Sequence, residues 1–172
     1  SNSTGDLLTT RPLRSPHHST SDVAIIGGGA RPKPGEVTLS HTGILFLDEL
    51  PEFKRSAIES LRQPLEDKQV TVSRAQDRVT YPADFLLIAI KNPCPCGYWG
   101  SSKPCICSPL EIDRYQKKLS GPLLDRIDLH VTVDSIDHTS LLRDNLDGQE
   151  KSDMVRKRVV DTIARQTQRF NS

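Results

Sequence analysis

Two continuous apolar runs stand out in the pattern of hydrophobic and polar positions along the chain, at residues 44–47 and 85–90. Runs of this length predict strands that are buried on both faces, as in the interior of a parallel sheet. Two adjacent carboxylates, Asp48 and Glu49, follow the first run, and Asn92 follows the second. Because open α/β sheets bind ligands at the carboxyl ends of their strands, these polar residues are candidate site residues. For the first run alone, a core strand leading into solvated acids is an equally good interpretation.

Helical periodicity appears on both sides of the second run. After Pro51, apolar residues recur at intervals of three and four as far as Leu65, which predicts an amphipathic helix. Pro64 predicts that this helix ends or kinks near Gln63. A second helix is expected over residues 109–119.

Alternation of apolar and polar positions predicts a hairpin and two further strands. Residues 69–74 and 77–81 flank a short polar break and are typical of a β-hairpin. Residues 36–40 alternate in the same way, which predicts a half-exposed strand, and residues 129–133 predict a third strand of the central sheet. Residues 3–22 are polar without a clear period, so a loop is expected there.

The composition becomes polar and charged beyond Asp134, which predicts a domain boundary. Residues 3–134 are expected to form one α/β domain, and residues 135–172 a linker followed by the first helix of a helical unit. In that helix an apolar stripe recurs with helical spacing among many Arg and Lys residues. A single amphipathic helix must bury its stripe against another element, so the second unit is expected to be incomplete.

Positive and negative charges nearly balance, with 23 Lys and Arg residues against 22 Asp and Glu residues. Net charge therefore gives no reason to expect a nucleic-acid or membrane partner. No apolar run approaches the roughly 20 residues that span a bilayer. The N-terminus also lacks the basic and then apolar pattern of a secretory signal. These features predict a soluble, cytoplasmic protein with no membrane partner.

The four cysteines form two Cys-x-Cys pairs, Cys94 with Cys96 and Cys105 with Cys107. In a reducing compartment such clustering favours a metal site over disulfides. Four thiolates complete the tetrahedral coordination of Zn²⁺ and leave no open position for water, so a structural zinc site is predicted. Because Cys-x-Cys is a less usual spacing than Cys-x₂-Cys, free or disulfide-bonded thiols are the alternative.

Two other candidate sites fail on spacing or geometry. The glycine triplet at residues 27–29 suggests a phosphate loop, since backbone amides can surround an anion. A phosphate loop ends in Gly-Lys-Ser or Gly-Lys-Thr and opens a helix, and residues 27–35 contain no such ending. Adjacent His17 and His18 point apart on an extended chain, so a metal site that uses both together with Asp48 is not expected.

Several segments resemble known motifs when they are taken in order. Residues 43–50 resemble a Walker B strand, Asn92 the sensor-1 residue, and residues 121–128 the segment that carries an arginine finger. Further motifs are Arg14-Ser15-Pro16-His17-His18, Gly27-Gly28-Gly29, Pro34-Gly35-Glu36, Leu47-Asp48-Glu49-Leu50-Pro51-Glu52-Phe53 and Asn92-Pro93-Cys94-Pro95-Cys96-Gly97-Tyr98. Together they resemble the AAA+ ATPases and, more narrowly, the magnesium-chelatase-like ComM (YifB) family, from about residue 11 to residue 133.

The resemblance implies an ATP site with Mg²⁺ as cofactor. Asp48 would hold the Mg²⁺ ion through its water shell. Glu49 would orient or deprotonate the water that attacks the γ-phosphate. Asn92 would form a hydrogen bond with that water or with the γ-phosphate.

The resemblance further implies that Arg126 is an arginine finger in a hexameric ring. It would act on the nucleotide of the neighbouring subunit, where a positive charge stabilises the transition state. By spacing alone, an ion pair of Arg126 with Asp125 or Asp128 is the simpler interpretation.

Two predicted hairpin regions are implied to contact DNA. The resemblance assigns residues 69–81 to a hairpin before sensor 1 and residues 23–39 to an insertion in the second helix. In such ring motors both face the central pore, where Lys and Arg contact the phosphate backbone. The candidate DNA-binding residues are Arg31, Lys33, Arg74 and Arg78. Each of these residues is also explained as an ordinary solvated charge.

The sequence thus predicts an α/β fold with a parallel sheet and flanking helices, and the resemblance implies a truncated AAA+ core with β-hairpin insertions and the start of a helical lid. The resemblance implies an ATP-driven hexameric motor that branch-migrates or unwinds DNA during recombination of incoming DNA. Family members carry a Walker A loop ending in Lys-Ser or Lys-Thr, and the 172 residues contain no such loop. This chain by itself is therefore expected neither to bind ATP tightly nor to hydrolyse it.

Two other functions fit parts of the sequence. One is the ATPase motor of a true magnesium chelatase, which the cysteine pairs disfavour because chelatase motor subunits are not expected to carry them. The other is a non-catalytic, zinc-stabilised DNA-binding module. That module would bind DNA without nucleotide, whereas a motor is expected to require ring assembly. The near-neutral charge disfavours the module.

Overall fold

The computed structural model describes residues 10–29, 32–73, 78–133 and 150–170. Arg31, Arg74 and nearly all of the predicted linker lie outside the described residues. The chain divides into two compact units, residues 1–133 and residues 134–172, and each is described by itself. Within the described ranges, no helix is long and apolar enough to cross a membrane.

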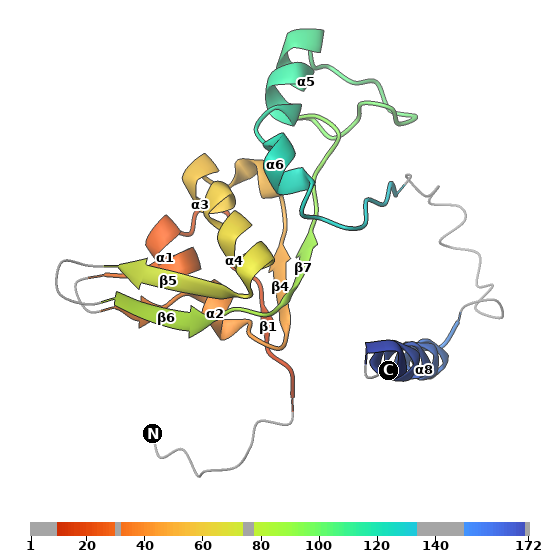
Figure 1. The fold of residues 1–172 in the computed structure, drawn as a ribbon. Helices are drawn as coiled ribbons and strands as arrows, with labels where there is room; N and C mark the ends of the chain where they lie inside the picture. The colour runs from red at the N-terminus through yellow and green to blue at the C-terminus, as the bar shows by residue number, and fades with distance from the viewer. Residues whose placement is uncertain (1–9, 30–31, 74–77, 134–149, 171–172) are drawn as a thin grey trace. The chain divides into compact units, whose positions relative to one another are not determined.

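A three-stranded parallel sheet forms the centre of the first unit, as the two apolar runs predict (Figure 1). Its strands are β1 (Leu13–Arg14), β4 (Ile44–Leu47) and β7 (Leu86–Ala89), in the order β1-β4-β7. The central strand β4 has two side chains, Leu45 and Leu47, that are at most 1% exposed. The predicted α/β fold class is confirmed, because helices flank this parallel sheet.

The prediction that the second apolar run is buried on both faces is wrong. Phe85 is 8% exposed, whereas Leu86, Ile88 and Ile90 are 60%, 39% and 46% exposed. Among the described strands only β4 pairs with β7, so β7 lies at an edge of the sheet. An apolar run predicts a sheet strand, but the elements that cover its two faces lie elsewhere in the sequence.

Helices beside β4 supply part of the remaining core. They are α1 (Asp22–Ile26), α3 (Arg55–Ser60) and α4 (Arg62–Asp67), and a 3₁₀ turn, η1 (Leu50–Glu52), follows β4 closely. Beyond the two β4 leucines, the buried core includes Ile25, Phe53, Ala57, Ile58, Leu61, Leu119 and Leu123. One hydrophobic cluster therefore joins β4 to elements that precede it and follow it in the sequence.

The helix predicted after Pro51 is divided into α3 and α4, with the break at Leu61 rather than near Gln63. Pro64 lies inside α4 and has no N–H to donate to the carbonyl of Ser60, the last residue of α3. The break therefore appears one turn before the proline, where the missing hydrogen bond would have closed the helix.

Residues 36–40 do not form the predicted strand. Instead α2 (Glu36–Leu39) begins after Gly35 and places Val37 in the core with no exposed surface. The buried Ser40 hydroxyl donates a 2.8 Å hydrogen bond to the Val37 carbonyl and so closes the turn. Val37 and Ser40 are both buried and lie three residues apart, which fits the helical period and not the strand period.

Two further predictions differ from the structure. Residues 129–133 form no strand, and their three large apolar side chains are 82–84% exposed. Residues 3–22 were expected to be a loop, yet β1 lies there. The backbone of β1 is held by a 2.8 Å hydrogen bond from Ile44 N to Pro12 O at the start of β4. Pairing with a distant strand, not local sequence, makes this segment a strand.

Two hairpins extend from the helical side of the sheet. The predicted hairpin is confirmed as β5 (Gln69–Ser73) and β6 (Arg78–Pro82), which pair antiparallel. A shorter hairpin pairs β2 (Gly27–Gly28) with β3 (Lys33–Pro34). The Tyr81 hydroxyl of β6 donates a 3.1 Å hydrogen bond to the backbone carbonyl of the residue before β3. The two hairpins therefore lie against each other.

Two short helices follow the cysteine segment. α5 (Pro109–Gln116) confirms the predicted helix, and α6 (Gly121–Leu124) leads to Arg126. The first turn of α5 is closed by a capping box, in which Ser108 and Glu111 satisfy each other's backbone amides. The start of α5 is thus fixed directly after the last cysteine.

The second unit contains the predicted amphipathic helix, α8 (Ser152–Phe170), among its described residues. Every side chain of α8 is exposed, including Val159, Ile163 and Phe170 of its apolar stripe. Whether this helix begins a lid stays a prediction.

Candidate functional site

The ends of the parallel strands bring predicted site residues to one edge of the sheet. A 2.9 Å backbone hydrogen bond from Leu50 to Ile90 joins the segments beyond the ends of β4 and β7. Asp48 and Glu49 lie on the first of these segments, and Asn92 lies on the second. In Figure 1 the arrowheads of β4 and β7 point toward α6, so this edge faces the part of the unit that carries α5 and α6.

Asp48 and Glu49 form a tight and strained turn. Glu49 has a left-handed backbone, with φ 52° and ψ 47°, which costs a non-glycine residue about 1 kcal/mol. Its amide donates a 2.9 Å hydrogen bond to Asp48 Oδ1, and both side chains are exposed. Strained backbone of this kind concentrates at functional sites, where the surrounding structure holds it.

A residue after β1 contacts this turn. His18 Nδ1 lies 3.0 Å from Glu49 Oε2. Each of the three strands therefore contributes a polar side chain at or near its carboxyl end: His18 after β1, Glu49 after β4 and Asn92 after β7.

Tyr115 of α5 lies next to the Asn92 segment and is 5% exposed. Burial raises the pKa of Tyr115, and the negative charge of Glu52 raises it further. A hydrogen bond from the Asn92 backbone amide acts in the opposite direction and favours the ionised phenol. The same helix is thus in contact with the segment that carries the sensor-1 candidate.

Arg126 is held by a glutamate on α4 rather than by Asp125 or Asp128. Its Nε and Nη2 lie 3.1 Å and 2.6 Å from Glu66 Oε2, and its Nη1 donates to the Pro122 carbonyl. The Arg126 side chain is 26% exposed and lines an open groove with polar residues of α4. The ion pair anticipated from spacing therefore exists with a different partner, and Arg126 does not join Asp48 and Glu49 within one chain.

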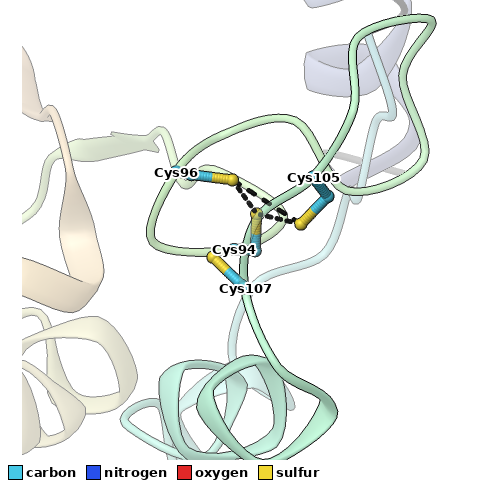
Figure 2. Close-up of side chains that lie close together, drawn as sticks. All are labelled: Cys94, Cys96, Cys105 and Cys107. Carbon is cyan, nitrogen blue, oxygen red and sulfur yellow. Dashed lines mark hydrogen bonds between the residues drawn. The ribbon is translucent and has the colours of Figure 1, made fainter.

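The four cysteine sulfurs form a compact cluster (Figure 2). Cys94 Sγ lies 3.4 Å from Cys96 Sγ and 3.7 Å from Cys105 Sγ, and Cys96 and Cys105 are 3.6 Å apart. All four sulfurs lie within 4.8 Å of one another, Cys107 included. Disulfides require about 2.05 Å between sulfurs. Tetrahedral Zn²⁺ with bonds of about 2.3 Å places its sulfurs about 3.8 Å apart. The spacing therefore fits a tetrahedral ion and excludes a disulfide in this conformation.

The thiols of the cluster differ in acidity. Backbone amides of Tyr98 and Ile106 donate to Cys96 and lower its pKa to about 6. The Cys96 amide favours the Cys107 thiolate, but burial and the neighbouring thiols outweigh it and raise the pKa of Cys107 to about 12. A thiolate metal site requires all of its cysteines to be deprotonated. Sulfurs this close repel one another when ionised, so all four can ionise only with a cation bound among them.

Two of the candidate DNA-binding residues are described. Lys33 is exposed on β3, and Arg78 is exposed at the start of β6. They lie on the two hairpins that the Tyr81 hydrogen bond joins. Arg31 and Arg74 lie outside the described residues.

Sequence reasoning missed three residues that contact the candidates: His18, Glu66 and Tyr115. The only local signal was His18, which was considered as a metal ligand with Asp48 and not as a partner of Glu49. Glu66 and Tyr115 lie on helical segments with no pattern that links them to Arg126 or Asn92. These contacts depend on tertiary structure.

Comparison with known proteins places the chain in a family. The family model described as magnesium chelatase, subunit ChlI, matches residues 1–141. The uncharacterized protein YifB of Salmonella typhimurium is 46% identical over 159 residues, which are 92% of this chain and 31% of that protein. Competence protein ComM of Haemophilus influenzae is 47% identical over 150 residues, which are 87% of this chain and 29% of that protein.

This chain spans about a third of the length of the curated YifB proteins that it matches. The matched region includes the sheet, both hairpins, the cysteine cluster and the segment of Arg126. The chain belongs to the magnesium chelatase, subunit ChlI, family.

Proposed function

We propose that the full-length protein is an ATP-driven motor that acts on DNA. The observation that carries the proposal is the placement of Asp48, Glu49 and Asn92 just beyond the ends of two adjacent parallel strands, in a member of this family. One relative, which aligns with most of this chain, is named a competence protein. That name supports a role in the recombination of incoming DNA. On this basis the motor branch-migrates or unwinds DNA in the cytoplasm.

The residues of the sheet edge have distinct roles in the proposed site. Mg²⁺-ATP, when bound, supplies the phosphoryl group and the cation that neutralises its charge. Asp48, an exposed carboxylate at the strand end, would hold the Mg²⁺ ion. Glu49 accepts a proton from the attacking water, and Asn92 orients that water from the neighbouring strand.

Arg126 is assigned to the nucleotide of an adjacent subunit in a hexameric ring. Its place at the end of α6 supports this role, because no described contact joins it to Asp48 or Glu49 of its own chain. In the ring, Arg126 exchanges Glu66 for the γ-phosphate, and both partners are anionic. Lys33, Arg74 and Arg78 are proposed to contact the DNA backbone.

The cysteine cluster is proposed to bind one structural Zn²⁺. The four sulfurs supply the complete ligand set, so the ion would have no open position for chemistry. Cys94 follows Asn92 closely, and Cys107 directly precedes the cap of α5. A metal here would fix the Asn92 segment to the start of α5.

Elemental analysis tests the zinc site. Protein purified without chelator should contain about one zinc per chain, because four clustered thiolates bind Zn²⁺ tightly at neutral pH. Cys105→Ser should lose most of that zinc, whereas Ser102→Ala in the same loop should retain it. Wild-type protein with much less than stoichiometric zinc would contradict the assignment.

ATP hydrolysis by the full-length protein tests the motor. Its hydrolysis of ATP should be stimulated several-fold by single-stranded or branched DNA, because a motor couples turnover to its track. The 172-residue chain, which contains no Walker A loop, should show neither hydrolysis nor micromolar ATP affinity by isothermal titration.

Each alternative has its own outcome in these assays. Micromolar ATP affinity of the 172-residue chain would contradict its proposed inactivity. A rate of ATP hydrolysis by the full-length protein that does not change when DNA is added would contradict the DNA motor. DNA binding by the 172-residue chain without nucleotide would favour a zinc-stabilised DNA-binding module.

A further inference from the structure

His18 contacts the carboxylate to which the proposed function gives the central chemical role. Its Nδ1 lies 3.0 Å from Glu49 Oε2, within hydrogen-bond distance. Neither group is deeply buried, since 33% of the His18 side chain and 48% of the Glu49 side chain are exposed. The contact therefore needs some other restraint to persist, because exposed pairs by themselves contribute little.

Neighbouring side chains hold the His18 imidazole in place. The prediction that His17 and His18 point apart is wrong, because the His17 ring packs on the His18 ring with centroids 4.0 Å apart. Phe53 meets the His18 ring edge-on at 6.3 Å and 80°. Phe53 is 6% exposed and belongs to the hydrophobic core. His17 is in turn restrained by Ser19, whose hydroxyl lies 2.9 Å from His17 Nδ1. The imidazole thus lies between a core aromatic ring and a second, hydrogen-bonded imidazole.

Glu49 is restrained from its backbone side. Its left-handed conformation and the hydrogen bond from its amide to Asp48 Oδ1 fix the direction in which its side chain leaves the turn. With both ends of the contact restrained, a hydrogen bond from His18 can hold the Glu49 carboxylate in one orientation. A carboxylate has two oxygens, so a hydrogen bond at Oε2 leaves Oε1 to accept a proton.

We propose that His18 is a positioning residue for Glu49. Its Nδ1–H donates to Oε2 and orients Oε1 toward the attacking water, in the way that a second group orients the base of a catalytic pair. This inference rests on the proposed ATP hydrolysis, and it assigns His18 no direct contact with ATP or Mg²⁺. The adjacent pair His17 and His18 then has a function as a support and a donor.

Kinetics of the full-length protein test this role. His18→Ala should lower kcat about tenfold, the low end of the loss when a supporting hydrogen bond to a functional ligand is removed. The KM for ATP should change less than about twofold, since binding is not affected. His18→Asn should restore most of the rate, because the Asn amide nitrogen occupies nearly the position of Nδ1. His130→Ala, an exposed histidine outside the site, is the matched control.

A double mutant separates positioning from general damage to the fold. In a Glu49→Gln background, His18→Ala should cause no further loss of kcat, because it acts only through the carboxylate. An equal loss in both backgrounds would overturn the proposal. So would wild-type or higher kcat for His18→Ala.

The contact itself has a readout that needs no ATPase activity. In ¹H–¹⁵N spectra of the histidine side chains of the 172-residue chain, the His18 Nδ1 signal should move in Glu49→Ala and stay in place in Glu52→Ala. An unchanged His18 signal in Glu49→Ala would overturn the proposal even if the motor assays succeed. A full-length protein without ATPase activity would instead refute the proposed function and the role of His18 in it.

Discussion

Glu49→Gln in the full-length protein is expected to lower kcat for ATP hydrolysis by about 100-fold or more. A positioned general base contributes roughly 10²–10⁴ to a rate, and glutamine retains the shape of glutamate but cannot take the proton. Affinity for ATP should be retained, because Asp48 and the phosphate-binding residues are unchanged. Single-turnover hydrolysis, measured together with binding of a fluorescent nucleotide, separates the two effects.

Glu52→Gln is the matched control for that experiment. Glu52 lies on the next turn of the same segment, is exposed, and forms a 3.0 Å ion pair with Lys118. Its substitution removes one negative charge from the same region without touching the proposed base, so kcat should stay within about twofold of wild type. Equal losses in Glu49→Gln and Glu52→Gln would mean that local charge, and not Glu49, controls hydrolysis.

The sequence predicts the parts of the fold for which the pattern within the segment is sufficient. Residues 44–47 are apolar throughout, and they are the central strand with neighbours on both edges. Residues 69–73 and 78–82 alternate apolar and polar side chains, and they form two strands that pair with each other. In both cases the information that determines the element is contained in the segment itself.

Predictions fail where the partner of a segment decides its structure. Residues 36–40 contain a helical turn because Val37 and Ser40, three residues apart, are both buried, whereas the alternation of apolar and polar residues favours a strand. Residues 129–133 alternate like a strand but pair with no described strand. The sequence of β1 has no distinctive hydrophobic pattern, and the segment is a strand because it pairs with the edge of β4.

The candidate site follows the same division. Asp48, Glu49 and Asn92 are predictable because each follows an apolar run, and parallel strands align their ends. The partners that restrain the candidate residues are not predictable from the sequence. Glu49 meets His18, and Arg126 meets Glu66, only after the chain has folded. Motifs therefore identify groups that perform chemistry, whereas the residues that orient those groups appear only in the structure.

The cysteine cluster connects the segment of Asn92 with helix α5. It lies between Asn92 and α5, and α5 returns to the Asn92 segment through Tyr115. A zinc ion in the cluster would close this loop at its open end. The proposed zinc site would then stabilise the sheet edge itself.

The second large effect is expected from Gly43→Ala, which should destabilise the 172-residue chain by about 2–3 kcal/mol. A Cβ at Gly43 would lie 2.0 Å from the backbone carbonyl oxygen of Pro12, and the backbone has no flexible end that can move aside. The same carbonyl accepts the 2.8 Å hydrogen bond from Ile44 that starts the pairing of β1 with β4. A methyl group must therefore separate the two strands or break that hydrogen bond. Urea unfolding followed by circular dichroism measures the change.

Gly121→Ala provides the control, because a Cβ built at that helical position has no atom within 4 Å apart from its chain neighbours and the backbone of its own helix. This variant should be neutral, or more stable by up to about 1 kcal/mol, since alanine favours a helix over glycine. Separation of β1 from β4 also moves His18 relative to Glu49, so Gly43→Ala should change the His18 side-chain spectrum, and Gly121→Ala should not. Equal stability of Gly43→Ala and wild type would show that β1 does not pack as closely on β4 as the structure places it.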